Sequence, residues 1–275
     1  AAAREGRPQV RARRHRSHPM SPIILETRAL TKAFKGFTAV SQVDLKVARG
    51  SIHALIGPNG AGKTTCFNLL TKFLEPSSGA ILFNGQDITR ERPAQIARRG
   101  VIRSFQISSV FPHLTVLENV RLGLQRRLGI SYHFWRSEGA LRSLHARAAA
   151  LLAEVGLEDL AGELAVNLPY GRKRALEIAT TLAMEPELML LDEPTQGMGH
   201  EDVHLVAQLI KRVSAGRTVL MVEHNMGVVS AIADSITVLQ RGAVLAEGPY
   251  AEVSANPQVM EAYMGTTEGR LQGAH

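Results

Sequence analysis

The sequence predicts an α/β fold in which helices cover a mixed sheet and a helical subdomain is inserted. Three apolar runs, LMLLD, TVLMVEH and SITVLQ, have the continuous hydrophobic character of parallel strands buried on both faces. An earlier run, SIHALIG, enters a glycine-rich loop that is followed by helical periodicity. Between about residues 114 and 164 strand signals disappear and apolar residues recur at helical spacing. Strands that alternate with helices on either side of such an insertion indicate an α/β core.

The predicted elements divide the chain into a core, an insertion and two tails. A chain of 275 residues is long enough for one large domain with an insertion and short for two independent domains. We expect a single domain over residues 21–265. Its parts are a core of residues 21–106 and 167–240, a helical subdomain of residues 107–166 and a C-terminal piece of residues 241–265. Residues 266–275 are expected to form a flexible tail.

Three stretches carry a helical pattern. A helix is expected from Lys63, because FNLLTKFL places apolar residues at three- and four-residue spacing until the PSSG turn. Near the C-terminal end, PQVMEAYMG is predicted to be a short amphipathic helix. Within the insertion, one helical face is formed by Leu141, Leu144, Ala148, Leu151, Leu152 and Val155.

The positive charge of the chain is concentrated in its first 19 residues. They contain six Arg and one acid, Glu5, and therefore carry +5 of the net charge of +7. The remainder is close to neutral, so no nucleic-acid partner is expected. The segment lacks apolar periodicity, and the first methionine is Met20. We expect residues 1–19 to be a disordered basic tail, either a tag remnant or an over-extended start, with a membrane-touching basic arm as the alternative.

Cysteine use and hydropathy favour a protein of a reducing compartment. Cys66 is the only cysteine of the sequence, which excludes an internal disulfide. The sequence contains neither a secretory signal pattern nor an apolar run near the roughly 18 residues that a membrane helix needs. We therefore expect a cytosolic chain, and we expect any membrane role to come through a partner.

Residues 57–65, GPNGAGKTT, match the pattern of a phosphate-binding loop. Glycines at positions such as Gly57 and Gly62 let the backbone turn sharply and aim its N–H groups at phosphate oxygens. Lys63 is expected to reach the β- and γ-phosphates, and the Thr64 hydroxyl to bind Mg²⁺. The remaining loop residues expected to contact a nucleotide are Pro58, Asn59, Gly60, Ala61 and Thr65. A plain glycine-rich turn is the alternative, and kinases, GTPases and motor proteins share the loop.

Two acids end the apolar run LMLLDEP. Asp192 would emerge at the carboxyl end of a strand beside the phosphate loop, where an aspartate can hold Mg²⁺. Glu193 follows directly and is placed to act as the general base that polarises an attacking water. Adjacent acids after a strand are also common in loops without a function, so this pair alone does not settle the activity.

A glycine-containing segment before these acids narrows the class. LPYGRKRALEIATTLAMEP starts a predicted amphipathic helix, and its position before LLDEP resembles the signature motif of ABC ATPases. The motif is usually LSGGQ, and here it would be formed by Leu168, Pro169, Tyr170, Gly171 and Arg172. The resemblance implies that these residues cap the ATP bound by the opposite subunit, using a helix N-terminus and the close backbone approach that Gly171 preserves.

Several positions depart from the family pattern. Pro169 replaces a serine whose hydroxyl would touch the γ-phosphate, although proline suits a first helical turn, and the catalytic competence of the opposite site is left open. Tyr170 in place of the first glycine looks like the branched-chain amino acid importer branch, and Arg172 could add charge there. QGMG replaces the usual SALD of the D-loop, so Gly199 stands where an Asp is expected.

Three further residues fit the same family in the expected order along the chain. Gln106, ending the predicted strand VIRSFQ, is at the Q-loop position, where an amide touches Mg²⁺ and the lytic water; a solvated strand end is the alternative. His224, ending TVLMVEH, matches the switch histidine that donates to the γ-phosphate. Phe34 matches the aromatic residue that stacks on adenine, with Phe37 or ordinary core packing as alternatives.

The resemblance covers about residues 21–265 and implies the ABC ATPase fold, a P-loop NTPase core with a helical subdomain. It implies an ATPase that uses ATP and Mg²⁺ and pairs with a second ATPase subunit, identical or related. Two transmembrane permease subunits and, indirectly, a solute-binding protein would be the other partners, at the cytoplasmic face of the membrane. FNLLTKFLEPSSGAILFNGQDIT, EHNM and EAYMG look like ATPase subunits of importers for branched-chain amino acids and related small polar solutes.

Other functions remain as alternatives at this point. The ATPase of the lipopolysaccharide exporter is a near relative of this branch. ABC ATPases that act on DNA or ribosomes generally carry long coiled coils or two ATPase domains, and the insertion lacks sustained heptads. A P-loop small-molecule kinase would not need the signature motif or the switch histidine.

Overall fold

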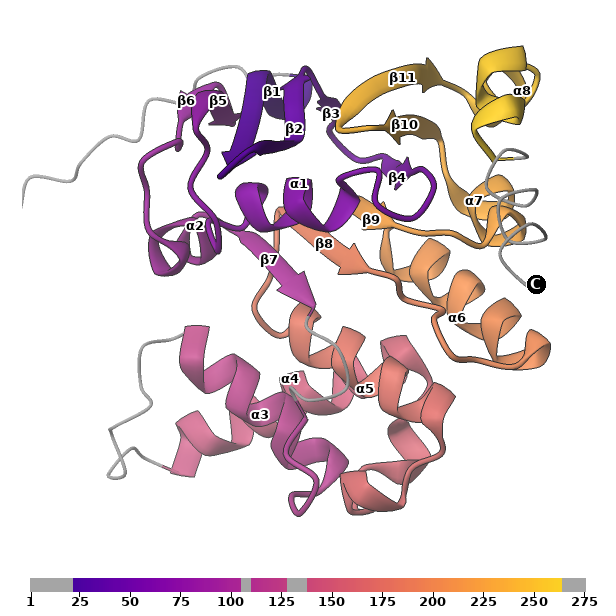
Figure 1. Cartoon of the computed structure of the whole chain (residues 1–275). Helices are drawn as coiled ribbons and strands as arrows, with labels where there is room; N and C mark the ends of the chain where they lie inside the picture. Colours follow the sequence, from indigo (N-terminus) through magenta and orange to yellow (C-terminus); the bar gives the residue numbers. More distant parts are fainter. Residues whose placement is uncertain (1–21, 105–109, 128–137, 264–275) are drawn as a thin grey trace, which may run out of the picture.

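The computed structural model describes residues 22–104, 110–127 and 138–263, which form two sheets and the helices around them (Figure 1). The strands are β1 (Ile23–Phe34), β2 (Phe37–Val43), β3 (Lys46–Ala48), β4 (Ile52–Ile56), β5 (Ser78–Phe83), β6 (Gln86–Asp87), β7 (Val101–Ser104), β8 (Leu188–Asp192), β9 (Thr218–Val222), β10 (Ser235–Gln240) and β11 (Ala243–Gly248). The helices are α1 (Lys63–Leu70), α2 (Pro93–Arg98), α3 (Val116–Arg127), α4 (Glu138–Val155), α5 (Tyr170–Leu182), α6 (His200–Val213), α7 (Met226–Ile232) and α8 (Tyr250–Ser254), with 3-10 turns at Glu158–Leu160 and Ala165–Asn167. Within these ranges no helix is long and apolar enough to cross a membrane.

A six-stranded sheet carries the candidate site. Its strand order is β11-β10-β4-β9-β8-β7, and neighbouring strands are parallel except for β10 and β11. The three apolar runs that predicted buried parallel strands form β8, β9 and β10, so this prediction is confirmed. Successive side chains of β8 enter two different cores, Leu188 and Leu190 on one face and Met189 and Leu191 on the other.

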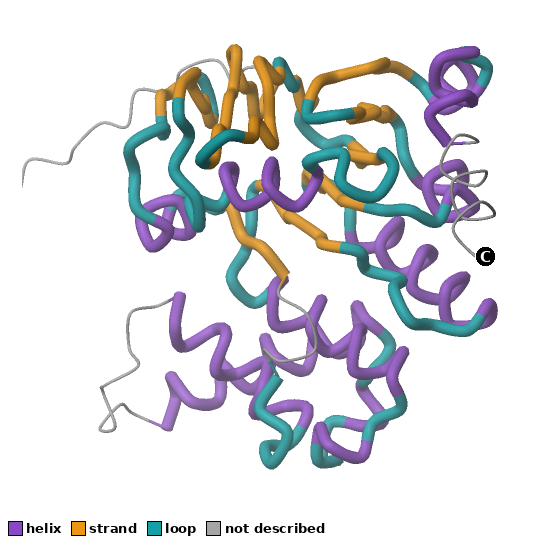
Figure 2. Tube along the Cα trace, viewed as in Figure 1, coloured by secondary structure: helices purple, strands orange, loops and turns teal. Residues whose placement is uncertain are grey.

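A second, antiparallel sheet is built from the N-terminal strands. Its order is β2-β1-β5-β6, and β3 also pairs with β1. The helix α1 lies between the two sheets (Figures 1 and 2). The sequence analysis did not predict a separate sheet here. The reason is that β1 changes partners along its length, pairing with β3 near Ile23 and with β2 from Leu30 to Phe34.

The helix after the glycine-rich loop is shorter than the apolar spacing predicted. It ends at Leu70, whereas the pattern continued to Leu74. Lys72 has φ 60°, in the left-handed region, and its ammonium group donates a hydrogen bond to the carbonyl of Thr89. A right-handed helix cannot continue through such a residue, so tertiary contacts overrule the local pattern here.

The insertion is helical, as predicted, and α3, α4 and α5 form a group beside the sheets (Figure 1). Four residues of the predicted apolar face are buried: Leu144, Ala148, Leu152 and Val155. Leu151 is half-buried, and the side chain of Leu141 lies outside the described residues. The helix α3 approaches α5 closely at Gly123, where an added Cβ would lie 2.9 Å from Cβ of Ala183.

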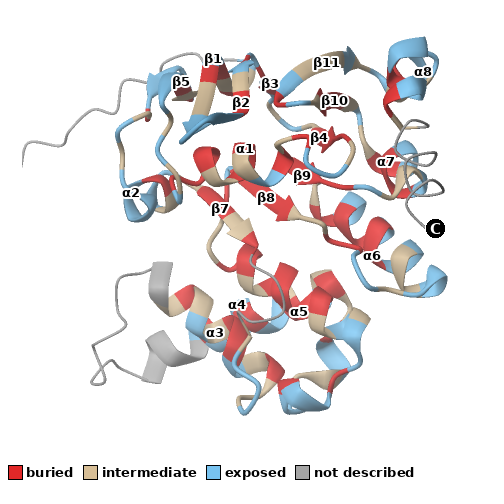
Figure 3. Cartoon of the chain, in the orientation of Figure 1, coloured by how far each residue is buried: buried red, intermediate tan, exposed pale blue. Residues whose placement is uncertain are grey.

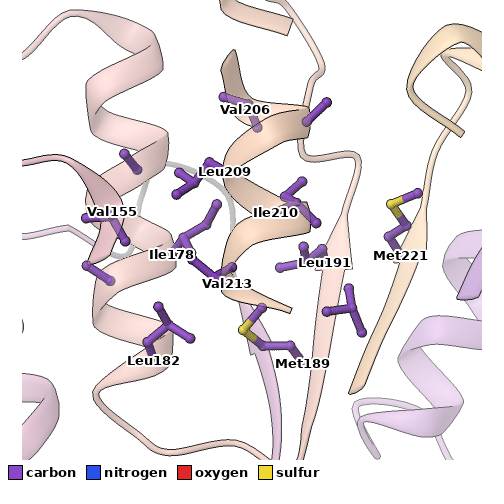
Figure 4. Close-up of a cluster of buried hydrophobic side chains, with 14 of the residues drawn as sticks. Val155, Ile178, Leu182, Met189, Leu191, Val206, Leu209, Ile210, Val213 and Met221 are labelled. Atoms are coloured by element: carbon purple, nitrogen blue, oxygen red, sulfur yellow. The ribbon is translucent and has the colours of Figure 1, made fainter. Parts of the chain in front are cut away.

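The larger apolar core joins this helical group to the sheet. Figure 3 shows buried residues along α5 and α6, and these residues share one core cluster with residues of the six-stranded sheet. In Figure 4, Leu209, Ile210 and Val213 of α6 lie between α5 and β8. The start of α5, which carries the signature-like residues, is therefore held by one continuous core to the strand that carries the two acids.

Candidate nucleotide-binding site

The phosphate loop follows β4, and two of its glycines are required by close backbone contacts. Gly57 has φ 149°, and an added Cβ would lie 2.2 Å from the carbonyl oxygen of Leu239. Gly62 has φ 100°, and an added Cβ would lie 2.4 Å from the carbonyl oxygen of Ala39. No other residue type fits these positions without moving the backbone, because real Cβ atoms do not approach carbonyl oxygens so closely.

Lys63 begins α1 and points back into the loop. Its Nζ donates to the carbonyl oxygens of Gly57 at 2.7 Å and Pro58 at 3.0 Å. The residue is 7% exposed, and burial lowers the pKa of its ammonium group, an effect that the nearby charge of Glu193 partly offsets. A positive charge is thus held at the loop, where phosphate oxygens would be recognised.

The remaining loop residues differ in exposure. Ala61 is buried, while Pro58 and Thr65 are half-buried. Asn59, Gly60 and Thr64 are exposed. Part of the loop, including Thr64, is therefore exposed, while Ala61 packs in the apolar core.

The two acids lie at the same sheet edge as the loop. Val222 of β9 pairs with Leu55 on one side and with Asp192 on the other. Leu55 is two residues before Gly57, so parallel pairing brings the end of β8 level with the start of the phosphate loop. The carboxylate of Asp192 accepts a hydrogen bond from Arg103, a residue that the sequence did not indicate.

Glu193 occupies an unusual backbone conformation directly after β8. Its φ is 44°, and its N–H donates to the carbonyl oxygen of Val222 at 2.9 Å. The left-handed region is costly for a residue with a side chain, and such residues recur at functional sites. The side chain is half-buried, and its negative charge partly offsets the lowering of the Lys63 pKa by burial.

The donors available for a magnesium ion are few but of the right type. Within the described ranges, no three His, Cys, Asp or Glu side chains gather as a metal cage. Thr64 and Asp192 supply a hydroxyl and a carboxylate, and Mg²⁺ in nucleotide sites takes one or two such protein ligands together with phosphates and water. Gln106, the third predicted ligand, lies outside the described residues.

A buried carboxylate that the sequence analysis missed organises the next loop. Glu223 is 0% exposed, and its Oε2 accepts from the backbone N–H groups of His224 at 2.7 Å and Asn225 at 3.0 Å. Its Oε1 accepts from the hydroxyl and N–H of Thr195. Glu223 therefore ties the loop after Glu193 to the loop that carries His224. The sequence signal that could have indicated Glu223 is an acidic residue directly after the apolar run TVLMV.

A second buried pair, also missed, braces the same region from α5. Arg174 is 4% exposed and donates to the carbonyl oxygens of Pro194 at 3.1 Å and Asp192 at 3.2 Å. It also pairs with the buried Glu177, whose pKa is raised by burial although Arg174 opposes that shift. These contacts fix the backbone on both sides of Glu193.

His224 points into solvent from the end of β9. Its side chain is 53% exposed, and Nδ1 lies 3.8 Å from Glu223 Oε2. The backbone of His224 is fixed through Glu223. The imidazole is thus carried by a fixed loop at the sheet edge and remains accessible to a ligand.

The signature-like residues form the exposed start of α5. Leu168 is buried, whereas Pro169, Tyr170 and Arg172 are exposed. Pro169 is the N-cap residue and not part of the first helical turn, so that expectation is wrong by one position. The φ of Pro169, −57°, would suit a helix, but its ψ of 158° is extended, so the helix starts at Tyr170.

Tyr170 contacts the loop after the two acids, and Gly171 lies against α6. The Tyr170 hydroxyl donates to the carbonyl oxygen of Gln196 at 3.0 Å. A Cβ on Gly171 would lie 2.9 Å from Oδ1 of Asp202. The D-loop residue Gly199 is the N-cap of α6 and is exposed. The signature-like and D-loop segments are therefore linked within one chain through Tyr170.

Arg172 is directed toward the insertion. Its Nη1 donates to the carbonyl oxygen of Gly156 at 2.7 Å, after the end of α4. That bond holds the guanidinium at the base of the insertion. The suggestion that Arg172 adds charge at the opposite site has no support in this geometry.

The aromatic candidates are paired across the turn between β1 and β2. Phe34 lies opposite Phe37 in the strand register, and the two side chains are 46% and 64% exposed. Lys32 Nζ lies 5.2 Å from the centroid of the Phe34 ring. The exposure excludes core packing for both residues, and either ring is free to meet a planar ligand.

The C-terminal helix, residues 257–263, reaches the phosphate loop and confirms the short helix predicted there. Burial raises the pKa of Tyr263 to about 12, and the nearby backbone of Gly57 partly offsets this shift. A cavity of about 590 Å³ lies between the loop and this helix, lined by residues that include Asn59, Arg241 and Glu261. The C-terminal helix therefore forms one wall of the cavity beside the phosphate loop.

These features define a nucleotide-binding cassette, and comparison with known proteins identifies its family. The chain belongs to the ABC transporter family, whose model matches residues 40–196. A model described as "Branched-chain amino acid ATP-binding cassette transporter" matches residues 243–269, which include the helix beside the phosphate loop. Membership of this family excludes the small-molecule kinase considered above.

Two curated relatives are similar over nearly their whole length. The high-affinity branched-chain amino acid transport ATP-binding protein BraF of Pseudomonas aeruginosa is 39% identical over 256 residues, covering 90% of this chain and 99% of the relative. LivG of Escherichia coli, with the same description, is 38% identical over 253 residues, covering 90% and 99%.

Solved structures confirm the ABC ATPase fold. The ADP conformation of MJ1267, an ATP-binding cassette of an ABC transporter, has a TM-score of 0.78 and 28% identity, covering 89% of this chain and 100% of that chain. A dimeric cassette, MJ0796 bound to ADP and Pi, has a TM-score of 0.69 and 25% identity, covering 82% and 99%.

Proposed function

We propose that this chain is the ATP-hydrolysing subunit of an ABC importer for branched-chain amino acids or related small polar solutes. The observation that carries the enzymatic part is the strand register that sets Asp192 level with Leu55, two residues before the phosphate loop. The descriptions of BraF and LivG as branched-chain amino acid transport proteins support the solute class.

In this proposal ATP lies along residues 57–65, with its adenine stacked on Phe34. Glu193 takes a proton from a water molecule whose oxygen attacks the γ-phosphorus, and the bond between that phosphorus and the bridging oxygen of ADP breaks. His224 and Gln106 donate hydrogen bonds around the γ-phosphate. Mg²⁺, held by Thr64, Gln106 and Asp192, would neutralise phosphate charge.

A second ATPase subunit would complete the site. Pro169, Tyr170 and Arg172 are exposed around the start of α5. We assign the signature-like segment, Leu168, Pro169, Tyr170, Gly171 and Arg172, to the nucleotide of the opposite subunit. The dimeric state described for MJ0796 supports this assignment.

Two transmembrane permease subunits would dock on the insertion. Phe111, Leu164 and Val166 are exposed apolar residues at the point where two segments of the insertion meet. Val166 N–H donates to the carbonyl oxygen of Pro112 at 2.9 Å, and Thr115 bridges to Leu164. We place this face against the permeases at the cytoplasmic side of the membrane. A solute-binding protein would be an indirect partner, and no nucleic-acid partner is proposed. In this proposal the core, residues 21–106 and 167–240, binds and hydrolyses ATP. The insertion, residues 107–166, connects the core to the permeases.

The direct test is Glu193→Gln in the full chain, because it removes the base and keeps the shape. We expect ATP binding close to wild type and turnover reduced at least ~100-fold, within the range general-base catalysis contributes. Membranes from the native host, solubilised with ATP, should yield two multi-span permeases with this variant when the co-purifying chains are identified by mass spectrometry. Substantial turnover would remove Glu193 from the base role, and recovery of soluble partners alone would refute the transporter.

A further inference from the structure

A guanidinium group that the sequence did not predict lies against the aspartate assigned to Mg²⁺. Arg103 is on β7, which runs parallel to β8 and pairs Arg103 with Leu190. Its Nη2 donates to Asp192 Oδ2, and its Nη1 donates to Asn68 Oδ1 of α1 at 2.7 Å. Arg103 thus links three elements that surround the phosphate loop: β7, β8 and α1.

Two aromatic rings also lie close to the guanidinium group of Arg103. Its Cζ lies 5.8 Å from the centroid of the Phe67 ring and 5.9 Å from that of Phe73. The side chains of Arg103 and Asp192 are 13% and 16% exposed. A planar cation packed against rings and bonded at two nitrogens is pre-organised, unlike an exposed surface ion pair.

Magnesium and Arg103 would draw on the same carboxylate. One oxygen of Asp192 already accepts from the guanidinium, and a positive charge beside a carboxylate weakens its attraction for another cation. Salt screens this repulsion less at a part-buried site than on an open surface. Arg103 is also one residue from Ser104, where β7 ends and the chain leaves for the insertion.

We propose that Arg103 is a positioning residue that holds Asp192 in the metal-free chain and competes with Mg²⁺ for its carboxylate. Metal binding with nucleotide then loosens an ion pair on the last strand before the helical insertion. The metal site is coupled in this way to the strand that leads to the permease-facing subdomain. The inference rests on the proposed metal-binding role of Asp192.

The test is the Mg²⁺ concentration at half-maximal binding of a fluorescent ADP analogue to the full chain. Arg103→Gln should lower this midpoint about five- to tenfold, because it removes the competing charge. Arg103→Lys, which keeps a charge without the two-nitrogen grip, should fall between wild type and Arg103→Gln. Mn²⁺ binding followed by electron paramagnetic resonance should show the same order without any turnover.

Matched controls separate this idea from simple damage and from a failed functional assignment. Arg99→Gln removes another ion-paired arginine, bonded to Glu91, and should leave the midpoint unchanged. Asp192→Asn should abolish the Mg²⁺ dependence; retention of a wild-type midpoint there would refute the metal role of Asp192 itself. If Asp192→Asn behaves as expected but Arg103→Gln leaves the midpoint unchanged or raises it, the competition by Arg103 is wrong.

A second variant serves if Arg103→Gln does not fold. Asn68→Ala removes one hydrogen bond to the guanidinium and leaves every charge in place. It should lower the Mg²⁺ midpoint about two- to threefold, because a less firmly held Arg103 is displaced more easily. A midpoint equal to or above that of wild type would contradict the proposal.

Discussion

The phosphate-loop side and the signature side of this chain are built in different ways. On the loop side, Ala61 is 2% and Lys63 7% exposed, and Gly57 packs against the backbone of Leu239. On the signature side, Tyr170 is 43% exposed, and Pro169 precedes it on the open surface. One side is a pocket wall supported by the chain's own core, and the other is a helix start that faces outward.

The difference shows that one chain builds two unequal halves of a site. The loop half has its contacts fixed before any ligand arrives, as electrostatic recognition of phosphate requires. The signature half offers backbone N–H groups at the start of α5 that its own nucleotide does not use in our proposal. Variants on the loop side should therefore affect the isolated chain, whereas variants on the signature side should act only when two subunits meet.

The largest effect is expected from Gly57→Ala. The added Cβ would lie 2.2 Å from the Leu239 carbonyl oxygen, so the loop must move away from Lys63 or the sheet must yield. We expect nucleotide binding to be lost and the free energy of unfolding to fall by about 2–4 kcal/mol. Calorimetric titration with ATP and urea unfolding measure the two effects.

Gly162→Ala is the matched control for Gly57→Ala, since no atom lies within 4 Å of its added Cβ. It should leave both binding and stability near wild type. Wild-type nucleotide affinity in Gly57→Ala would show that the loop is not held as the structure places it.

Glu223→Gln tests the buried carboxylate that links the loops after β8 and β9. Glu223 accepts hydrogen bonds from Thr195, His224 and Asn225, and the neutral amide cannot accept with both of its terminal atoms. We expect a loss of about 2–3 kcal/mol in the free energy of unfolding. Glu163→Gln, an exposed acid, should change it little. Equal stability of the two variants would remove Glu223 from this structural role.

Gly171→Ala should separate the two sides of the site. The added Cβ meets only the end of the Asp202 side chain, which can rotate, so folding and nucleotide binding by the isolated chain should stay close to wild type. In the assembled transporter we expect turnover to fall about tenfold, because the helix start can no longer approach the opposite nucleotide closely. Weakened nucleotide binding in the isolated chain would instead place Gly171 on its own loop's side.

The smallest effect is expected from Tyr263→Phe. It removes a hydroxyl whose pKa the backbone of Gly57 lowers, and an interaction of this kind contributes at most what one hydrogen bond does, about 0.5–1.5 kcal/mol. The Kd for ATP should rise about two- to tenfold, with Tyr250→Phe as the control. An unchanged Kd would mean that the C-terminal helix packs beside the loop without supporting it.

The sequence by itself determined the fold class and the order of the site motifs. The loop pattern around Lys63, the acids Asp192 and Glu193, and the apolar strands that precede them are local signals, because each depends on residues close together in the chain. Parallel strands then bring their carboxyl ends to one edge, so these residues could be expected to meet.

Only the tertiary structure decided which side chains brace that edge. Arg103 meets Asp192 across 89 positions, and Glu223 meets Thr195 across 28, and no local pattern specifies such pairs. The same holds for the early end of α1 and for the bond that turns Arg172 toward Gly156. Local periodicity sets the element and its buried face, whereas the partner of a polar side chain depends on which distant elements the core packing brings beside it.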